Sequence, residues 1–201
     1  MNQGHHLLAI DVETGGFLVG EHAVLAIAAV PTWEQSPFYC KVQPWLEQKI
    51  DPEAARVNGY TEERWRMALS LEHAMGAFKN WLAWRPKEIE EVWPLAHNAG
   101  FDRAFLDWAE ICTGVKLGLR HNWRCSMAVL MFLQDMGLCT PRYGDRRSSC
   151  SLDALCAVSG QERPAGAHDA LVDAGCALRG YLWMARQMAV AVNDGLKMSV
   201  N

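Results

Sequence analysis

Three short apolar runs within the first 42 of its 201 residues limit this chain to folds that begin with an antiparallel meander. The runs cover residues 7–12, 23–30 and 38–42, and the first ends just before the Gly15-Gly16 turn. Runs of this length bounded by turn residues are typical of β-strands. Further along the chain, strand-like and helix-like patterns alternate. The sequence therefore predicts an α/β fold, with a mixed sheet and helices on both of its sides.

Helical spacing of apolar residues predicts most of the later elements. The predicted helices cover residues 52–57, 70–84, 127–136, 151–158 and 168–190, another helix follows Asn98, and a strand covers residues 91–97. Asn98 stands where an N-cap residue is expected. A polar segment with three arginines, residues 140–149, separates two of the helices.

Composition limits the class of protein. Half of the residues are apolar and nine are Trp, so one domain of this length can bury a sizeable core. Seven cysteines without a CxxC pair indicate reduced thiols and a cytoplasmic location rather than a disulfide framework or a zinc site. The longest apolar run, residues 23–30, is far shorter than the roughly 20 residues that span a bilayer, so no membrane association is expected.

Acidic residues recur in three short segments, at residues 11–15, 97–102 and 168–173. The segments supply four carboxylates and one histidine, namely Asp11, Glu13, Asp102, Asp173 and His168. Any one of these acids could be a solvated surface residue. Asp11, Asp102 and Asp173 lie among apolar neighbours, however, where an acid is costly unless it pairs with a metal ion or a partner. Carboxylates on separate elements are the ligands that two hard divalent cations such as Mg²⁺ require.

The net charge is −4, which is unusual for a protein that binds nucleic acid. Two bound dications would neutralise the four carboxylates and bring the loaded chain close to zero. The charge therefore does not exclude a phosphate-rich substrate.

The same residues carry a family resemblance. A DxETG turn at residues 11–15, an HNxxFD segment at 97–102 and an HxxxxD pair at 168–173 resemble, in this order, the three motifs of DnaQ-like 3′-to-5′ exonucleases of the histidine-bearing DEDDh branch. The resemblance covers roughly residues 6–186 of a single domain, 1–201, and leaves a short C-terminal tail. It implies a ribonuclease H-like fold with a five-stranded mixed sheet.

The resemblance also assigns roles to the five residues. Asp11, Glu13, Asp102 and Asp173 are expected to hold two divalent ions, Mg²⁺ or Mn²⁺. His168 is expected to act as the general base, because an unperturbed imidazole pKa near 6.5 suits proton transfer at neutral pH.

A second group of residues is expected to hold the 3′ end of the substrate. Backbone N–H groups of Thr14 and Gly15 are predicted to face the terminal nucleotide, and Phe17 or its neighbour Leu18 to wedge between the last bases. The alternative is a tight turn with one core aromatic residue.

By the resemblance, Asn98 and Phe101 support this pocket, and Tyr60, with Gly59, shapes its rim. His97 is interpreted either as a packing residue or as a contact. Asp169 is expected to favour the dipole of the last helix rather than to bind metal.

Other features leave alternatives open. A basic rim that follows the strand could be formed by Arg142, Arg146, Arg147 and Arg163, or these residues could simply be solvated. Residues 124–126, Arg-Cys-Ser, replace an Asp-Thr pair that relatives often carry, which leaves the local packing open. The Trp81/Trp84 and Met184/Met188 pairs indicate core packing or a homodimer face.

The sequence thus predicts a metal-dependent 3′-to-5′ exonuclease. Its expected partner is a nucleic acid with a free 3′ end, in particular single-stranded DNA, from which it releases nucleoside 5′-monophosphates. An exoribonuclease similar to oligoribonuclease or ribonuclease T is the nearer alternative. A non-catalytic nucleic-acid-binding protein on the same fold is the more distant one.

Overall fold

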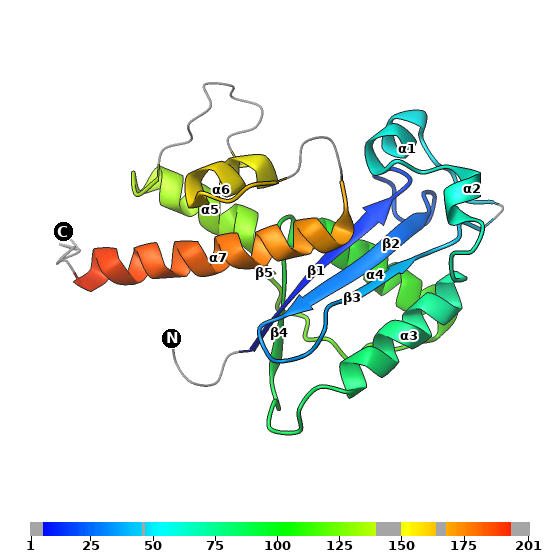
Figure 1. The fold of residues 1–201 in the computed structure, drawn as a ribbon, viewed down its shortest axis with the longest axis horizontal. Coiled ribbons are helices and arrows are strands. Elements are labelled where there is room, and N and C mark those ends of the chain that lie inside the picture. Colours follow the sequence, from blue (N-terminus) through cyan, green and yellow to red (C-terminus); the bar gives the residue numbers. More distant parts are fainter. Residues whose placement is uncertain (1–5, 46, 140–149, 164–167, 194–201) are drawn as a thin grey trace.

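A five-stranded mixed sheet forms the centre of the fold (Figure 1). The computed structural model describes residues 6–45, 47–139, 150–163 and 168–193. The strands are β1 (His6–Thr14), β2 (Val24–Pro31), β3 (Phe38–Lys41), β4 (Val92–Ala96) and β5 (Arg124–Cys125), in the order β3-β2-β1-β4-β5. Strands β1 to β3 form the predicted antiparallel meander, and β4 and β5 extend the sheet in parallel pairing.

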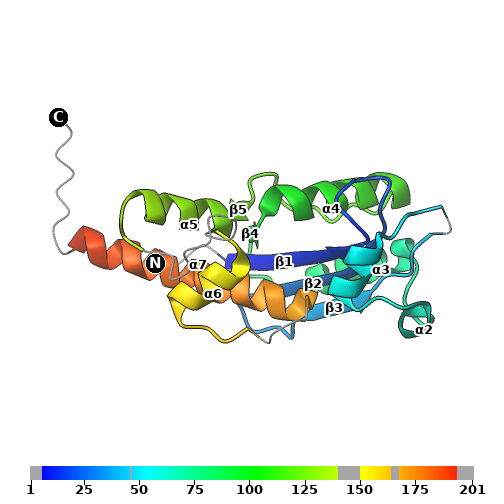
Figure 2. The same ribbon diagram turned by 90° about the horizontal axis from the view of Figure 1, so that it is seen from above.

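Helices cover both sides of this sheet, which confirms the predicted α/β architecture. They are α1 (Pro52–Asn58), α2 (Glu62–Trp65), α3 (Leu71–Ala83), α4 (Ala99–Thr113), α5 (Ser126–Asp135), α6 (Leu152–Ser159) and α7 (Ala170–Asn193). Figure 2 shows α4 and α7 on opposite sides of the strands. Within the described residues, no helix combines the length and the apolar character that a membrane span needs.

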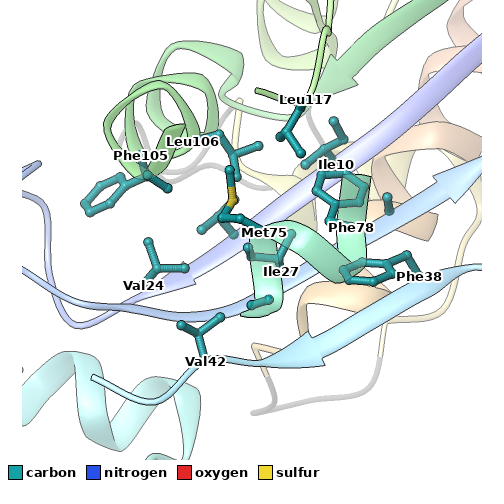
Figure 3. Packing of buried hydrophobic residues seen from close by; sticks show 14 of the residues in the cluster. Ile10, Val24, Ile27, Phe38, Val42, Met75, Phe78, Phe105, Leu106 and Leu117 are labelled. Atoms are coloured by element: carbon teal, nitrogen blue, oxygen red, sulfur yellow. The ribbon is translucent and has the colours of Figure 1, made fainter. Parts of the chain in front are cut away.

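The largest core fills the space between the sheet and helices α3 and α4 (Figure 3). Ile10 and Ile27 point into it from the strands, and Phe78 and Phe105 meet them from the two helices. Each of these side chains is fully buried, and burial of such a side chain contributes about 1.5–3 kcal/mol. Because side chains alternate along a strand, the residues between these core positions face the other side of the sheet.

Helix α7 packs on that other side. Leu7 and Ala9 of β1 share a buried cluster with Ala174 and Leu178 of α7. Asp11 continues the same alternation along β1, so its side chain lies on the α7 side of the sheet.

A further cluster joins α5 and α6 to α7. It includes Leu130 and Leu133 of α5, Leu155 of α6 and Met184 of α7. The helices approach closely at Gly180, where a Cβ atom would lie 2.6 Å from the side chain of Leu155. This packing fixes the direction of α7 and therefore the position of its first turn.

Candidate active site

The predicted acidic residues come together at the end of β1. Asp11 and Glu13 lie opposite Ala28 and Ala26 of β2, on the face that α7 covers. Ala170, the first residue of α7, packs against these two alanines. The small side chains of β2 therefore let the start of α7 approach the carboxylates of β1.

Asp102 reaches the same place from the first turn of α4. Its side chain is 4% exposed, and its Oδ1 accepts a 3.0 Å hydrogen bond from the backbone N–H of Val12. Strand β4 pairs with β1 only as far as Ala9, so a strand N–H beyond that point needs another partner. Burial raises the pKa of Asp102 to about 7, although the Val12 N–H opposes this shift.

The carboxylates of β1 lie in the same crowded environment. Burial raises the pKa of Asp11 well above its usual range, and the neighbouring charges of Asp102, Glu13 and Asp173 raise it further. Burial raises the pKa of Glu13 to about 8, with smaller contributions from Asp173 and Asp102. Such a cluster is unfavourable without compensating positive charge.

Glu13 gives the clearest sign that the cluster suits a cation. Its Oε1 is buried and accepts no hydrogen bond from any described residue. A buried carboxylate oxygen without a donor is costly, and a divalent ion would satisfy it. The oxygen-rich donor set of Asp11, Glu13, Asp102 and Asp173 fits hard cations such as Mg²⁺ or Mn²⁺.

Asp173 has a partner within the chain. Arg163 Nε donates to Asp173 Oδ1 at 2.8 Å, and Arg163 Nη2 donates to Oδ2 at 2.5 Å. The third guanidinium nitrogen, Nη1, donates to Asp153 Oδ1 of α6 at 2.6 Å. The sequence left open whether Arg163 belongs to an exposed basic rim or is simply solvated. The structure shows neither, because two carboxylates hold its side chain inward. The other three arginines of that prediction, at 142, 146 and 147, lie outside the described residues.

His168 lies beside these acids but two residues before α7 begins. Its Nδ1 is 3.8 Å from Asp173 Oδ2, and half of its side chain is exposed. One ligating atom each of Glu13, His168 and Asp173 lie within 4.8 Å of one another. A half-exposed imidazole on a non-helical segment can reach a water molecule at the carboxylates.

Asp169 caps α7. Its Oδ1 accepts hydrogen bonds from the backbone N–H groups of Leu171 at 2.9 Å and Val172 at 3.2 Å. This agrees with its predicted role at the start of the helix.

The turn after Glu13 differs in one respect from the prediction. The N–H of Gly15 donates to the carbonyl of Ala23 at 2.7 Å, so it does not point toward a nucleotide. A Cβ atom at Gly15 would lie 2.6 Å from the carbonyl oxygen of Lys49, so glycine is needed here for close packing. Thr14 is buried, and its Oγ1 donates to the carbonyl of Gly16 at 2.7 Å.

Phe17 and Phe101 meet next to this turn. Phe17 is 83% exposed, and its ring packs edge-on against that of Phe101 on α4, with centroids 6.2 Å apart. Asn98 occupies the N-cap position of α4 as predicted, but its exposed side chain makes no capping hydrogen bond. An exposed aromatic ring and an amide that makes no capping hydrogen bond thus lie at the start of α4, the helix that carries Asp102.

Tyr60 lies farther from the carboxylates. Its ring packs against Trp65, with centroids 5.2 Å apart, and the preceding Gly59 lines a cleft of about 200 Å³ that also contains Glu13 and His168. Gly59 therefore lines the cleft, whereas Tyr60 is not among the lining residues and instead contacts Trp65, which is.

His97 is a packing residue in the structure. Its Nδ1 lies 3.0 Å from Ser126 Oγ, and its Nε2 lies 2.9 Å from the carbonyl oxygen of Cys150. Burial lowers the pKa of His97 to about 4. Ser126, in the segment that departs from the family pattern, is fully buried and supplies this contact.

His22 is a supporting residue that the sequence reasoning missed. The N–H of Leu18 donates to His22 Nδ1 at 3.1 Å, and His22 Nε2 lies 3.3 Å from Asp51 Oδ2. The buried imidazole therefore ties the loop that carries Phe17 to the segment before α1. No motif marks this residue, because its role depends on contacts between segments distant in sequence.

Comparison with known proteins agrees with this geometry. The exonuclease family model RNase_T matches residues 8–181. The 3′-5′ DNA exonuclease Cap18 of Escherichia coli is 35% identical over 50% of this chain and 54% of its own length. Ribonuclease T of Haemophilus influenzae strain PittEE is 30% identical over 66% of this chain and 64% of its own length. The chain thus matches between about half and two thirds of the length of these relatives.

Solved structures show the same fold. The crystal structure of E. coli Exonuclease I in complex with a dA16 oligonucleotide superposes with a TM-score of 0.73 at 17% identity, over 94% of this chain and 42% of that one. The expected ribonuclease H-like fold is therefore confirmed. With the exonuclease family model matched over residues 8–181, most of its length, the chain belongs to the RNase_T exonuclease family.

Proposed function

We propose that the chain is a metal-dependent 3′-to-5′ exonuclease that releases nucleoside 5′-monophosphates from single-stranded DNA ends. One observation carries the proposal: four carboxylates from β1, α4 and α7 lie together beside a half-exposed histidine. Membership of an exonuclease family supports the hydrolytic reaction.

Asp11, Glu13, Asp102 and Asp173 are the residues that would hold the ions. Bound divalent ions supply charge stabilisation for the attacking and leaving oxygens of the phosphodiester. The crowded carboxylates are suited to this role because mutual repulsion and burial outweigh the one positive side chain beside them, Arg163, and leave the pKa values of Asp11, Glu13 and Asp102 raised.

His168 is proposed as the general base. Its position outside the helix gives the ring freedom to approach a water molecule, and no described side chain other than Asp173 forms an ion pair with it. Proton transfer by a positioned group contributes about 10²–10⁴-fold to a rate, so His168→Gln is expected to lose about that much activity. Calorimetry should show that the variant binds Mg²⁺ as the wild type does. A parallel loss of metal affinity would instead make His168 a ligand.

Phe17 and Phe101 are proposed to hold the terminal nucleoside. An exposed aromatic ring next to the carboxylates can stack on a base, which contributes about 1–3 kcal/mol per base. Asn98 is proposed to contact the same nucleotide, since its side chain is exposed and makes no capping hydrogen bond. Thr14 and Gly15 are proposed to shape this pocket through the turn that they form, and Tyr60 is proposed to support the neighbouring cleft through its contact with Trp65.

The names of two relatives support different substrates for this chain. The DNA exonuclease Cap18 has the higher identity, which supports DNA, whereas the relative named ribonuclease T keeps a 3′-to-5′ exoribonuclease as the second candidate. A site that selects RNA over DNA would do so through contacts to the 2′-hydroxyl group.

An assay with matched oligomers tests the proposal. DNA and RNA of equal sequence, labelled at the 5′ end, are incubated with Mg²⁺ or Mn²⁺ and resolved by length over time. The proposal expects a descending ladder from DNA, with nucleoside 5′-monophosphates as the released product. Single strands should be degraded faster than blunt duplexes, because unpairing an end costs a few kcal/mol.

Asp11→Asn is the matched control for contaminating nucleases. Early release of the 5′ label as a mononucleotide, or cleavage of a circular single strand, would contradict the proposed direction. A ladder from RNA but not from DNA would favour the second candidate.

A further inference from the structure

A cleft opens from the carboxylates toward the edge of the sheet. It holds about 200 Å³ and is lined by Glu13 and His168 at one end and by Lys41 and Arg64 at the other. We call it the β3 cleft, after the strand that carries Lys41. It lies on the α7 side of the sheet, whereas Phe17 and Phe101 lie on α4 and the turn beside it.

The register of the strands explains the cleft. Glu13 of β1 lies opposite Ala26 of β2, and Ala26 lies opposite Lys41 of β3. One step along, Ala28 lies between Asp11 and Tyr39 in the same way. Side chains of residues directly opposite each other in a sheet lie on the same face. The small side chains of the two buried alanines therefore leave space above β2, between the acids of β1 and strand β3.

Trp65 fixes one end of this cleft. Its ring is buried and held by a 2.7 Å hydrogen bond from Nε1 to the carbonyl of Leu25. The ammonium group of Lys41 lies 4.1 Å from the ring centroid, and the guanidinium of Arg64 lies 5.8 Å from it. Cation–π contacts therefore hold two positive groups next to each other.

These two charges are not neutralised by acids. Lys41 Nζ and the Arg64 guanidinium make hydrogen bonds to backbone carbonyls, and neither forms an ion pair with a carboxylate among the described residues. Arg56, which also lines the cleft, differs because it pairs with Glu53 at 2.6 Å. Asp169 in the cleft is occupied as the cap of α7. Lys41 and Arg64 therefore offer positive charge to a ligand.

We propose that the β3 cleft binds phosphate groups of the nucleic-acid strand on the 5′ side of the scissile bond, with Lys41 and Arg64 as the phosphate-binding side chains. The inference rests on the proposed exonuclease function. The cleft is continuous with Glu13 and His168, so an anion in it is adjacent to the reacting phosphate. A strand whose terminal nucleoside lies at Phe17 and Phe101 continues past the carboxylates into the cleft.

A substrate without upstream phosphates separates this role from catalysis. The p-nitrophenyl ester of thymidine 5′-monophosphate presents only the scissile phosphate, whereas a thymidine oligomer extends beyond it. Lys41→Gln and Arg64→Gln are each expected to raise the KM for the oligomer about 3–10-fold and to leave kcat/KM for the ester within about twofold. Lys79→Gln, an exposed change on α3, is the control for a general loss of charge.

Salt dependence gives a second measurement. With Ca²⁺ in the buffer, the anisotropy of a fluorescent thymidine oligomer reports its binding. The slope of log affinity against log salt concentration should be smaller in magnitude by about 0.7 for each variant than for the wild type. Equal oligomer KM and equal slopes for wild type and both variants would overturn the phosphate-binding role. If the wild type hydrolyses neither substrate while both variants weaken oligomer binding, the cleft stands and the proposed exonuclease function fails. Equal losses with the ester and the oligomer would place the defect at the reacting centre and also overturn the proposal.

Discussion

Burial raises the pKa values of Asp11, Glu13 and Asp102, and for Asp11 and Glu13 the neighbouring acids raise them further, so the ionised forms of these acids are unfavourable in the metal-free protein. Each acid is held in place by an element rather than by a partner side chain. Ionic repulsion between them therefore lowers the stability of the metal-free protein without displacing the groups.

Replacing Asp11 by Asn should separate stability from activity. The variant removes an acid whose ionisation is opposed by burial and by the neighbouring acids, so we expect the free energy of unfolding in EDTA to rise by about 1 kcal/mol at alkaline pH, where the acids are ionised. Loss of one proposed ligand should reduce nuclease activity more than about 10³-fold, because metal ions contribute several kcal/mol to such reactions. Urea unfolding and the oligomer assay measure the two effects. Near-wild-type turnover would contradict the ligand assignment.

His97 should make the fold sensitive to acid. Because burial lowers its pKa to about 4, the folded state keeps the ring neutral while the unfolded state binds a proton below about pH 6.5. Stability from this residue is thus present above pH 6.5 and is lost as the pH falls toward 4, by at most about 3 kcal/mol.

His97→Gln tests this pH dependence because its amide can still donate and accept hydrogen bonds at Ser126 and Cys150. The difference in unfolding free energy between wild type and variant should shrink as the pH falls from 6.5 to 4. A constant difference over this range would exclude His97 as the source.

The elements differ in how well the sequence predicts them. The three meander strands have apolar runs bounded by turn residues, and the helices α3, α4 and α7 have apolar residues at helical spacing, so the sequence predicts all of them and the structure confirms them within a few residues. Strand β5 has two residues, too few for any periodicity, and is held by pairing with β4. Helix α2 has four residues and one buried side chain, Trp65. Such short elements form through tertiary contacts, which a local pattern does not contain.

The residues of the candidate site also differ in whether the sequence could predict them. The acids and His168 could be predicted because they stand in motifs at the ends of long elements. The clamp of Arg163 on Asp173 and Asp153 could not, because ten residues separate the arginine from each acid and a charged loop residue is usually solvated. Likewise, the Gly15 N–H bond to Ala23 depends on the exact register of β1 and β2.

Arg163 should link α6 and α7 in the metal-free protein. Removing one partner of a buried ion pair typically costs 3–5 kcal/mol, so Arg163→Met is expected to lower the unfolding free energy in EDTA by about that amount. Saturating Mg²⁺ should reduce the difference, because Asp173 then has another positive neighbour. Arg179→Met is a matched control, since Arg179 is exposed and bonds to the same segment through Gln161. Equal urea midpoints for the two variants in EDTA would refute the clamp.

At the scale of the whole molecule, metal binding and folding should be coupled. Glu13 and Asp102 have folded-state pKa values near 8 and 7, above their unfolded values, so their contribution to the stability of the metal-free protein falls as the pH rises through this range. Scanning calorimetry in EDTA should show the melting temperature falling by about 5 °C or more between pH 6 and 8.5.

Mg²⁺ at about 100 times its dissociation constant adds about 2.7 kcal/mol, and the gain should be largest at alkaline pH, where the acids are ionised. A melting temperature that does not respond to Mg²⁺ at any pH would argue against the metal centre.

The central position of β1 in the sheet affects which part of the active site is lost first when the protein partly unfolds. β1 pairs with β2 along its length and with β4 along its first half, whereas His168 and Asp173 belong to the segment that begins α7. Amide hydrogens of a central strand exchange through openings close to global unfolding, while a segment at the end of an element can open locally at lower free energy. Partial opening of α7 would then take away the histidine and one carboxylate while Asp11 and Glu13 stay in place. Function would disappear in a state that still contains most of the sheet, and closing one helix would restore it.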